Sequence, residues 1–462
     1  MRRPAACLAL WLACGCGAAR KPAPNLLLIS VDTLRADRLA CYGGPRDLGR
    51  ALCALADTGT RYTWAFSTAP ATAPSVASLL TGLYPRSHGV SQHARSVLAD
   101  RVPTLAAALH EAGYATAAFV SNPVLERGKR LDRGFEVYDD EMPRRERNRP
   151  GYRERAARET TDAALAWARS APEPRFLWVH YQDPHGPYEP PGAGPARDPP
   201  GGHVLPLLDD DSGYGGIPAY QALPGARTRE AYAARYDAEI RQLDRQIRRL
   251  VRGLDALGRP PFAIATADHG EALGEDGFFF AHGHSVGLDQ IRVPLLVRPG
   301  EPREATTIGA PVSLVDVMPT LLAAAGVAPP DGAEGRVLPA SVAGAPEGAD
   351  ATRPLFAEHG RQVAVVRGDR YLARDRDPGA TLGPDGRPWG KKSPALPERT
   401  AALPADPTAA LPTYSDADGA ADRSALEPLL DGFLGAGRAA ATYRPEVPAE
   451  TRARLGALGY AE

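Results

Sequence analysis

The sequence predicts an α/β protein with a mainly parallel central sheet sandwiched between helices and a smaller antiparallel subdomain at its C-terminal end. Two observations carry this prediction. Short apolar runs alternate with longer helical patterns through most of the chain, as expected for parallel strands joined by helical crossovers. From about Glu358 the pattern changes to short strand-like runs, followed by a polar stretch rich in proline and alanine.

Four short apolar runs predict strands that are buried on both faces of the sheet. Each is only five or six residues long, which is too short for an ordinary globular helix. They are Leu26–Val31, Ala115–Val120, Phe176–His180 and Phe262–Thr266.

Helical periodicity fills the intervals between these runs. Ser75–Leu83 begins after Pro74, and proline is favoured in a first helical turn. Thr104–Ala112 ends at Gly113, a typical helix stop. Thr228–Leu257 is longer and carries one apolar stripe, so we expect it to cover a face of the sheet.

The remaining segments predict the domain organisation. Gly- and Pro-rich stretches at Pro190–Pro224 and Pro329–Ala351 are expected to be loops. Gln362–Val366 and Tyr371–Ala373 predict short antiparallel strands, and a terminal helix follows them. We therefore expect a targeting segment at residues 1–20, the catalytic α/β domain at 21–357 and the C-terminal subdomain at 358–462.

The N-terminus has the shape of a secretory signal peptide. Arg2 and Arg3 give it a positive start, and the apolar stretch Ala5–Ala13 is too short to span a bilayer. Cys14 and Cys16 lie where a bacterial lipoprotein signal has its lipidated cysteine, although neither has leucine at the third position upstream. We predict an exported protein, periplasmic or on the outer surface, anchored to the membrane as a lipoprotein in preference to plain secretion.

Charge and cysteine content exclude two further kinds of protein, namely nucleic-acid binders and proteins built on a cysteine zinc cluster. The chain has 54 basic and 55 acidic residues, so no overall field favours nucleic acid and we expect no nucleic-acid partner. Beyond the leader only Cys41 and Cys53 remain, which are too few for a zinc cluster. They either form a disulfide in an oxidising compartment or are two small buried residues, and their spacing leaves both readings open.

Polar residues follow three of the predicted strands. Asp32 comes directly after the first, and the third leads into Asp183 and His185. Asp268 and His269 come just past the fourth. Because open parallel sheets bind ligands at the carboxyl ends of their strands, we expect these side chains to share one site.

Carboxylate and imidazole groups in such a place indicate a divalent metal, namely Zn²⁺, Mn²⁺ or Ca²⁺. Asp32, Asp268 and His269 form the predicted ligand set, and Gly270 permits the sharp turn that two adjacent ligands require. Asp183 is a candidate for a second ion. Taken singly, each carboxylate could equally be a helix cap or a turn residue.

Thr72 precedes the predicted helix at Ser75, where free backbone N–H groups make a ready anion site. A nearby metal would lower the pKa of its hydroxyl and make it a nucleophile toward phosphorus or sulfur. The alternative is a helix-capping threonine. His282 and His284, after an aromatic run, are candidates for binding a second metal, protonating a leaving group or holding an anionic oxygen.

Taken together, these residues resemble the sulfatase-like branch of the alkaline phosphatase superfamily. The similarity extends over nearly the whole chain after the leader. The matching stretches are PNLLLISVDTLRADRLACYG (24–43), TAPSVASLLTGLYPRSHGV (72–90), GYATAAFVSN (113–122), FLWVHYQDPHGPY (176–188), ATADHGEALGEDGF (265–278) and HGHSVGLDQIRVPLLV (282–297), with weaker matches at 360–374 and 452–460.

The resemblance implies an α/β sandwich whose metal is held by Asp32, Asp268 and His269. It places Thr72 at the nucleophile position, and His185 and His284 at positions that contact the anion or the leaving group. Sulfatases of this family have a cysteine or serine at the nucleophile position, converted to formylglycine, and threonine does not fit that conversion.

Other charged residues of the family are also replaced. Val76 stands where an arginine is expected, Thr33 where a second acidic residue is expected, and Ser121–Asn122 where a lysine is expected. Asn122 can serve instead as a neutral hydrogen-bond donor to an ester oxygen. These departures favour phosphorus modestly over sulfur.

The sequence thus predicts a metal-dependent hydrolase or transferase of phosphate or sulfate esters. Its substrate would be a small molecule, a glycan or a lipid headgroup. The alternative is a surface-anchored binding or assembly module that keeps the fold with a degenerate site. The retained metal-ligand set and Thr72 favour the enzyme.

Overall fold

A computed structural model describes residues 22–91, 96–348, 350–376, 398–406, 408, 411–414 and 419–436. The predicted signal peptide, with Cys14 and Cys16, lies outside these residues, as does the weak match at 452–460.

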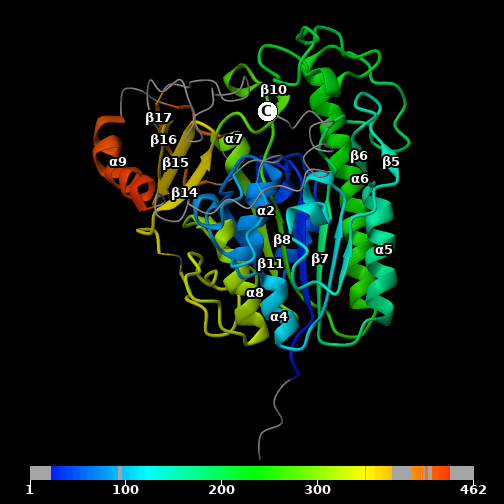
Figure 1. Ribbon diagram of the computed structural model, residues 1–462. Helices are drawn as coiled ribbons and strands as arrows, with labels where there is room; N and C mark the ends of the chain where they lie inside the picture. The colour runs from blue at the N-terminus through cyan, green and yellow to red at the C-terminus, as the bar shows by residue number, and fades with distance from the viewer. Residues whose placement is uncertain are drawn as a thin grey trace, which may run out of the picture.

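A mixed, mostly parallel sheet forms the centre of the molecule (Figure 1). The four predicted strands lie next to one another in it, in the order β8-β1-β7-β3, and all run parallel. Their bounds are β1 (Leu26–Val31), β3 (Ala115–Val120), β7 (Arg175–Tyr181) and β8 (Phe262–Ala267). The α/β fold class predicted from the sequence is therefore confirmed.

The edges of the sheet were not predicted. On one side β11 (Arg292–Arg298) pairs antiparallel with both β8 and β2 (Thr60–Phe66). Polar residues interrupt the apolar pattern of β2, and Pro294 lies at a register shift in β11, so neither segment reads as a strand. The outer strands are β4 (Val137–Asp139), β12 (Thr306–Ile308) and β13 (Val312–Ser313).

Helices cover both faces of this sheet (Figure 1). The long helix α6 (Arg229–Asp255) packs with α5 (Ala157–Ser170) on one face. On the other lie α2 (Thr72–Thr81), α4 (Leu105–Glu111) and α8 (Val317–Ala325). Helix α2 begins three residues before the predicted start, so Thr72 lies inside its first turn, with Ala71 as the N-cap.

Shorter elements connect these layers. The helices α1 (Arg50–Cys53), α3 (Pro85–His88) and α7 (Leu288–Ile291) are single turns. Two small hairpins project from the loops: β5 (Arg144–Arg145) with β6 (Arg153–Glu154), and β9 (Ala272–Leu273) with β10 (Phe279–Ala281).

A smaller antiparallel sheet follows, as predicted, and starts three residues before the expected boundary. It comprises β14 (Leu355–His359), β15 (Gln362–Arg367), β16 (Arg370–Asp375) and β17 (Arg399–Ala402), with α9 (Gly419–Ala436) packed against it. One apolar cluster joins this sheet to the main domain, because Trp64 and Phe66 pack with Leu355 and Tyr371.

Cys41 and Cys53 form a disulfide, with their Cα atoms 5.7 Å apart. This decides between the two readings that the sequence left open. Among the described residues, none of the helices combines the length and apolar character that crossing a membrane would need.

Candidate active site

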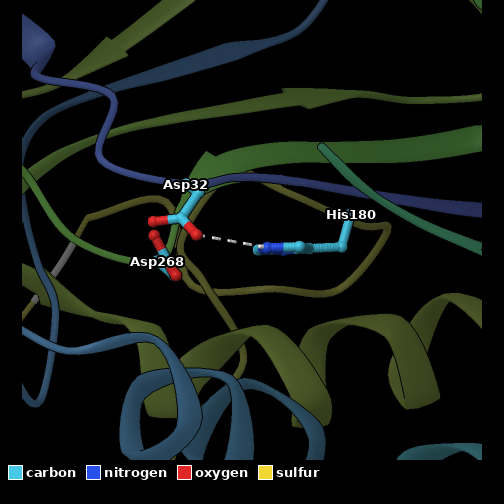
Figure 2. A group of neighbouring side chains, drawn as sticks. All are labelled: Asp32, His180 and Asp268. Carbon is cyan, nitrogen blue, oxygen red and sulfur yellow. Dashed lines mark ion pairs between the residues drawn. The ribbon is translucent and has the colours of Figure 1, made fainter. Parts of the chain in front are cut away.

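The carboxyl ends of the central strands bring the predicted polar residues together. Val31 lies opposite Tyr181 on one side and Ala267 on the other, so Asp32 and Asp268 leave neighbouring strands at the same level. Their carboxylates and His180, from the end of β7, offer ligand atoms that all lie within 4.8 Å of one another (Figure 2). All three side chains are fully buried.

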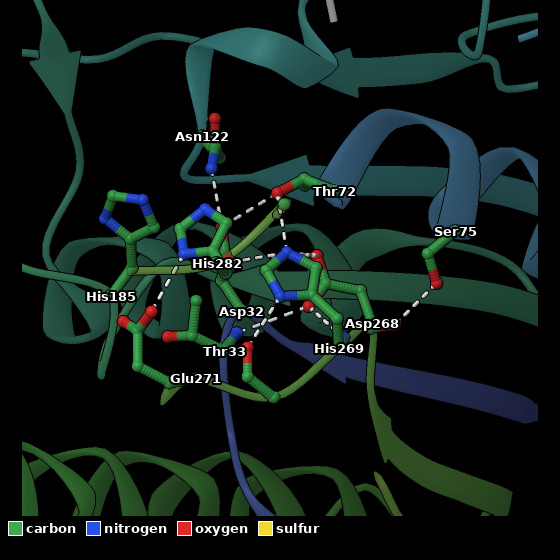
Figure 3. A network of polar contacts seen from close by, with 12 residues as sticks. Asp32, Thr33, Thr72, Ser75, Asn122, His185, Asp268, His269, Glu271 and His282 are labelled. Carbon is green, nitrogen blue, oxygen red and sulfur yellow. Dashed lines mark hydrogen bonds and ion pairs between the residues drawn. The ribbon is translucent and has the colours of Figure 1, made fainter. Parts of the chain in front are cut away.

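His269 and Thr72 close the group from two further directions (Figure 3). His269 Nε2 lies 3.6 Å from Asp32 Oδ1 and 3.7 Å from Asp268 Oδ2. Thr72 Oγ1 lies 3.3 Å from His269 Nε2 and 3.5 Å from Asp32 Oδ2. The structure therefore places the predicted hydroxyl against the predicted ligands.

Three atoms of this group lack a hydrogen-bond partner although they are buried. They are Asp32 Oδ1, Asp268 Oδ2 and His180 Nε2. Buried polar atoms are costly when unpaired, so three that converge indicate a missing partner. Two ligand atoms at about 2.1 Å from one tetrahedral ion stand about 3.4 Å apart, close to the separations seen here. The residues thus fit a divalent cation.

Burial and mutual charge set the protonation of the two carboxylates. Burial alone would raise the pKa of Asp32, but the close approach of His180, with Nε2 3.8 Å from Asp32 Oδ2, and the charges of His185 and His269 bring it below its usual range. Burial raises the pKa of Asp268, and the charge of Asp32 raises it further. A cation between them would remove this repulsion and hold both as carboxylates.

Local hydrogen bonds orient both histidines toward the carboxylates. His269 Nδ1 lies 2.9 Å from Gly270 O, which leaves Nε2 to face Asp32 and Asp268. His180 Nδ1 lies 2.9 Å from Ser30 Oγ. The tight turn depends on Gly270 as expected, because a Cβ there would lie 2.2 Å from Asp289 O.

Helix α2 is hydrogen-bonded to the turn that carries Asp268 and His269. Ser75 Oγ donates to Asp268 O at 2.6 Å and accepts from Ser67 Oγ. Thr33, where the resemblance expects an acidic residue, instead donates its backbone N–H to Asp268 Oδ1 from a left-handed conformation (φ 55°). A β-branched residue is strained in that conformation, and such strain is often kept at functional sites.

Asn122 lies in the site, but its amide is already engaged. Its Nδ2 donates to Asp32 Oδ2 at 2.5 Å. Its Oδ1 accepts from Val124 N and from the hydroxyl of Tyr152. Asn122 therefore orients Asp32, and its predicted contact with an ester oxygen stays a prediction.

His185 and His282 line the site beside His269 (Figure 3). The His282 ring centroid is 4.6 Å from that of His269 and 5.1 Å from that of His185. His282 Nδ1 lies 3.0 Å from Glu271 Oε1, and Tyr188 donates to the other oxygen of this buried carboxylate. Burial raises the pKa of Glu271 well above its usual range.

Two predicted residues make their described contacts elsewhere. His284 stacks on Phe278, with 3.5 Å between ring centroids, and its Nε2 lies 2.8 Å from Gln290 Nε2. Asp183 accepts from Ala157 N at the start of α5. Their proposed roles in catalysis and metal binding stay predictions.

Sequence reasoning did not assign His180 as a ligand, and it preferred His284 to His282. His180 was visible as the last residue of a predicted strand, but strand alternation alone does not show that its ring reaches Asp32. The pairing of His282 with Glu271 joins residues eleven positions apart and had no sequence signal.

The fold and site together define an α/β protein with a buried cluster of candidate metal ligands at the carboxyl ends of parallel strands. The chain belongs to the sulfatase family of the alkaline phosphatase superfamily, which it matches over residues 24–327.

Characterised relatives share this region. The ulvan-active sulfatase of Formosa agariphila is 27% identical over 341 residues, which cover 68% of this chain and 64% of that protein. The delta 4,5-hexuronate-2-O-sulfatase of Bacteroides thetaiotaomicron is 24% identical over 357 residues, which cover 69% of this chain and 71% of that protein. The chain thus spans slightly less than two thirds of the first relative and somewhat more of the second.

Solved structures share the fold. A 2-O glycosaminoglycan sulfatase aligns with TM-score 0.66 and 18% identity, covering 93% of this chain and 96% of that one. The phosphonate monoester hydrolase of Agrobacterium radiobacter aligns with TM-score 0.64 and 20% identity, covering 90% and 96%.

Proposed function

We propose that this protein is a metal-dependent hydrolase of sulfate esters and that Thr72 is its nucleophile. The observation that carries the proposal is the position of the Thr72 hydroxyl, 3.5 Å from Asp32 and 3.3 Å from His269 in a fully buried cluster. Membership of the sulfatase family supports the ester class.

Asp32, Asp268, His269 and His180 would hold the metal ion. When bound, a divalent cation lowers the pKa of a nearby hydroxyl and attracts the anionic oxygens of an ester. The chain itself supplies position, because hydrogen bonds from Ser75 and Asn122 fix the first turn of α2 and the carboxylate of Asp32.

The reaction follows from the residues around Thr72. On ionisation the hydroxyl gives its proton to water, and its oxygen bonds to sulfur while the bond from sulfur to the ester oxygen breaks. His282, backed by Glu271, gives a proton to the departing oxygen. Water then attacks the sulfur of the sulfothreonine, and the bond from sulfur to Thr72 Oγ1 breaks. One proton of this water returns to His282, the other passes through solvent to Thr72 Oγ1, and sulfate is released.

Phosphate esters are the second candidate substrates. The observation that favours them is the threonine at position 72 of the sequence, since the same steps at phosphorus give a phosphothreonine without any prior conversion of the side chain. For sulfate esters, the alternative to a threonine nucleophile is a formylglycine formed within residues 71–86. Mass analysis of the peptide that contains residues 71–86 separates the two, because conversion of a residue changes the peptide mass.

Two variants of Thr72 test the proposal. Thr72→Val keeps the shape but removes the hydroxyl, and we expect kcat on aryl sulfate and aryl phosphate esters to fall by about a hundredfold or more. Thr72→Ser keeps a hydroxyl and is expected to retain much of the activity. Full activity of the valine variant, with metal content unchanged, would contradict the nucleophile.

The non-enzymatic alternative makes a different prediction. A binding or assembly module would show no turnover of either ester class with Zn²⁺, Mn²⁺ or Ca²⁺, even when metal analysis gives stoichiometric binding. Wild-type turnover that depends on Asp32 and Asp268 rules that alternative out.

We further propose that the substrate is a sulfated glycan and that the protein is exported and lipid-anchored. The names of the ulvan-active and hexuronate sulfatases support the first point, and the disulfide, which is typical of oxidising compartments, supports the second. Cell fractionation of Cys14→Ala and Cys16→Ala variants tests the anchor, because loss of the lipidated cysteine moves the protein from the membrane to the soluble fraction.

A further inference from the structure

The hairpin formed by β5 and β6 carries Arg149 to the outer side of His185. We propose that Arg149 is a specificity-determining residue that binds a second anionic group, a carboxylate or another sulfate, on the leaving-group side of the ester. This inference rests on the proposed function and names the substrate class within it.

Arg149 belongs to an aromatic box that surrounds the His185 ring. Its guanidinium carbon lies 4.5 Å from the ring centroid of Tyr152 and 4.1 Å from that of Tyr220. The same two rings flank His185, with centroid distances of 6.4 Å for Tyr152 and 6.1 Å for Tyr220. Arg149 and His185 therefore lie beside the same two rings.

Exposure shows which end of the box faces outward. Tyr152, Tyr220 and His185 are buried, whereas 16% of the Arg149 side chain is exposed. Arg149 is thus the member of this box that solvent reaches most. Burial lowers the pKa of His185 to about 4, and the negative charge of Asp32 opposes that shift. The positive charge of Arg149 lowers the pKa further, as expected if Arg149 lies near His185.

A buried carboxylate fixes the direction of the guanidinium. Arg149 Nε and Nη2 donate to the two oxygens of Glu146 at 2.9 and 2.8 Å. Asn148, the preceding residue, donates to Tyr220 O and Ala222 O, which ties the hairpin to the neighbouring loop. A side chain held in this way pays little entropy on binding an anion.

The box is also connected to the reacting groups. The Tyr152 hydroxyl donates to Asn122 Oδ1, and Asn122 donates to Asp32. In this proposal an ester held by the metal ligands and protonated from His282 directs its leaving group past His185 toward Arg149. Flat or ring-shaped groups fit against the aromatic walls, and an anion beyond them meets the guanidinium.

A matched pair of esters tests the inference. The probes are 4-carboxyphenyl sulfate and its methyl ester, together with the corresponding phosphates. In the wild type we expect kcat/KM to favour the carboxylate. Arg149→Gln should reduce that preference about tenfold or more, mainly through KM, while kcat/KM for the methyl ester changes little.

Three controls separate recognition from structure. Arg153→Gln removes an exposed arginine on β6 of the same hairpin and should leave the preference unchanged. Arg149→Lys should restore part of it, because the charge is kept and the fork is lost. Glu146→Gln/Arg149→Gln removes both members of the ion pair and should match the single Arg149 variant.

The outcomes are distinguishable. Equal losses on both esters in Arg149→Gln, or an unchanged preference, would overturn the inference while the proposed function stands. A wild type that hydrolyses none of the four esters would overturn the proposed function, and this inference with it.

Discussion

His282 and His284 are two residues apart but face different surroundings. His282 pairs with buried Glu271 and lies next to the rings of His185 and His269. His284 stacks on Phe278 and faces Gln290. The proposed role of proton donor therefore fits the surroundings of His282 better than those of His284.

Exchanging each histidine for glutamine tests this assignment. We expect His282→Gln to lower kcat on esters with poor leaving groups by about a hundredfold, because the proton donor is lost. His284→Gln should cost much less activity and is the matched control. Equal losses in both variants would contradict the assignment.

The buried side chain of His88 should make the stability of the protein depend on pH. Burial lowers its pKa to about 3, and its ring accepts from Val90 N and faces Ser78 Oγ, which suits the neutral form. Between pH 6.5 and 3 the unfolded chain therefore binds a proton that the folded chain does not, so stability falls as pH falls.

At pH 5 this difference costs about 2 kcal/mol of unfolding free energy. We expect a His88→Gln variant to lose less stability than the wild type between pH 7 and pH 5 in urea unfolding. His110→Gln, at an exposed position on α4, is the control. Parallel pH profiles for wild type and His88→Gln would refute the prediction.

At the scale of elements, strand ends and one helix start create the site. The parallel register of β1, β7 and β8 fixes the level of Asp32, His180 and Asp268, and the first turn of α2 brings Thr72 to them. Each element contributes one or two side chains, so no single segment could show the whole arrangement.

The disulfide holds helix α1 next to the segment that follows β1. It joins Cys41 to Cys53 at the end of α1, and α1 packs against α6 through Asp244, which accepts from the Ala51 and Leu52 amides. Closing a loop of this length lowers the conformational entropy of the unfolded chain, which raises the free energy of unfolding by about 3 kcal/mol.

We therefore expect a Cys41→Ser/Cys53→Ser variant to unfold at a lower temperature than the oxidised wild type by several degrees. Addition of a reductant should lower the wild-type Tm toward that of the variant and leave the variant unchanged. If reductant has no effect on the wild-type Tm, the disulfide does not contribute as argued.

At the scale of the whole molecule, the two sheets share one apolar cluster. Trp64 and Phe66 of the central sheet pack with Leu355 and Tyr371 of the smaller one, and Tyr371 donates to Val286 O. Neither sheet can expose this surface without cost, so the domains predicted from the sequence should not unfold separately.

Calorimetry of the full chain should accordingly show one cooperative transition, with the van't Hoff enthalpy close to the calorimetric value. Trp64→Ala removes a large side chain from the shared cluster and should lower the Tm of that single transition. Two resolved transitions in the wild type would indicate independent domains.

Metal binding should be linked to this global unfolding. Because the candidate ligands follow or end β1, β7 and β8, an ion held by them would bind only the folded state, and each tenfold rise in free metal above Kd would add about 1.4 kcal/mol to the free energy of unfolding. We expect a chelator to lower the Tm and added metal to restore it, whereas Asp268→Asn should show neither effect. A wild-type Tm that is insensitive to metal would argue against the site.

The residue pattern alone was sufficient to predict the α/β class, the four central strands and the polar residues that follow them. This was possible because buried parallel strands are continuous apolar runs, and because ligand sites of open sheets lie where those runs end. It also placed Thr72 near the start of a helix, and the structure moved that start by only three residues.

Only the tertiary structure decided which side chains meet. In the structure His180 joins the cluster, and His282 rather than His284 lies beside His269. Asp183 accepts a hydrogen bond at the start of α5. The structure also pairs Cys41 with Cys53 and places β2 and β11 in the sheet. These outcomes depend on register, ring orientation and packing between segments distant in the chain, and local residue patterns do not encode those distances.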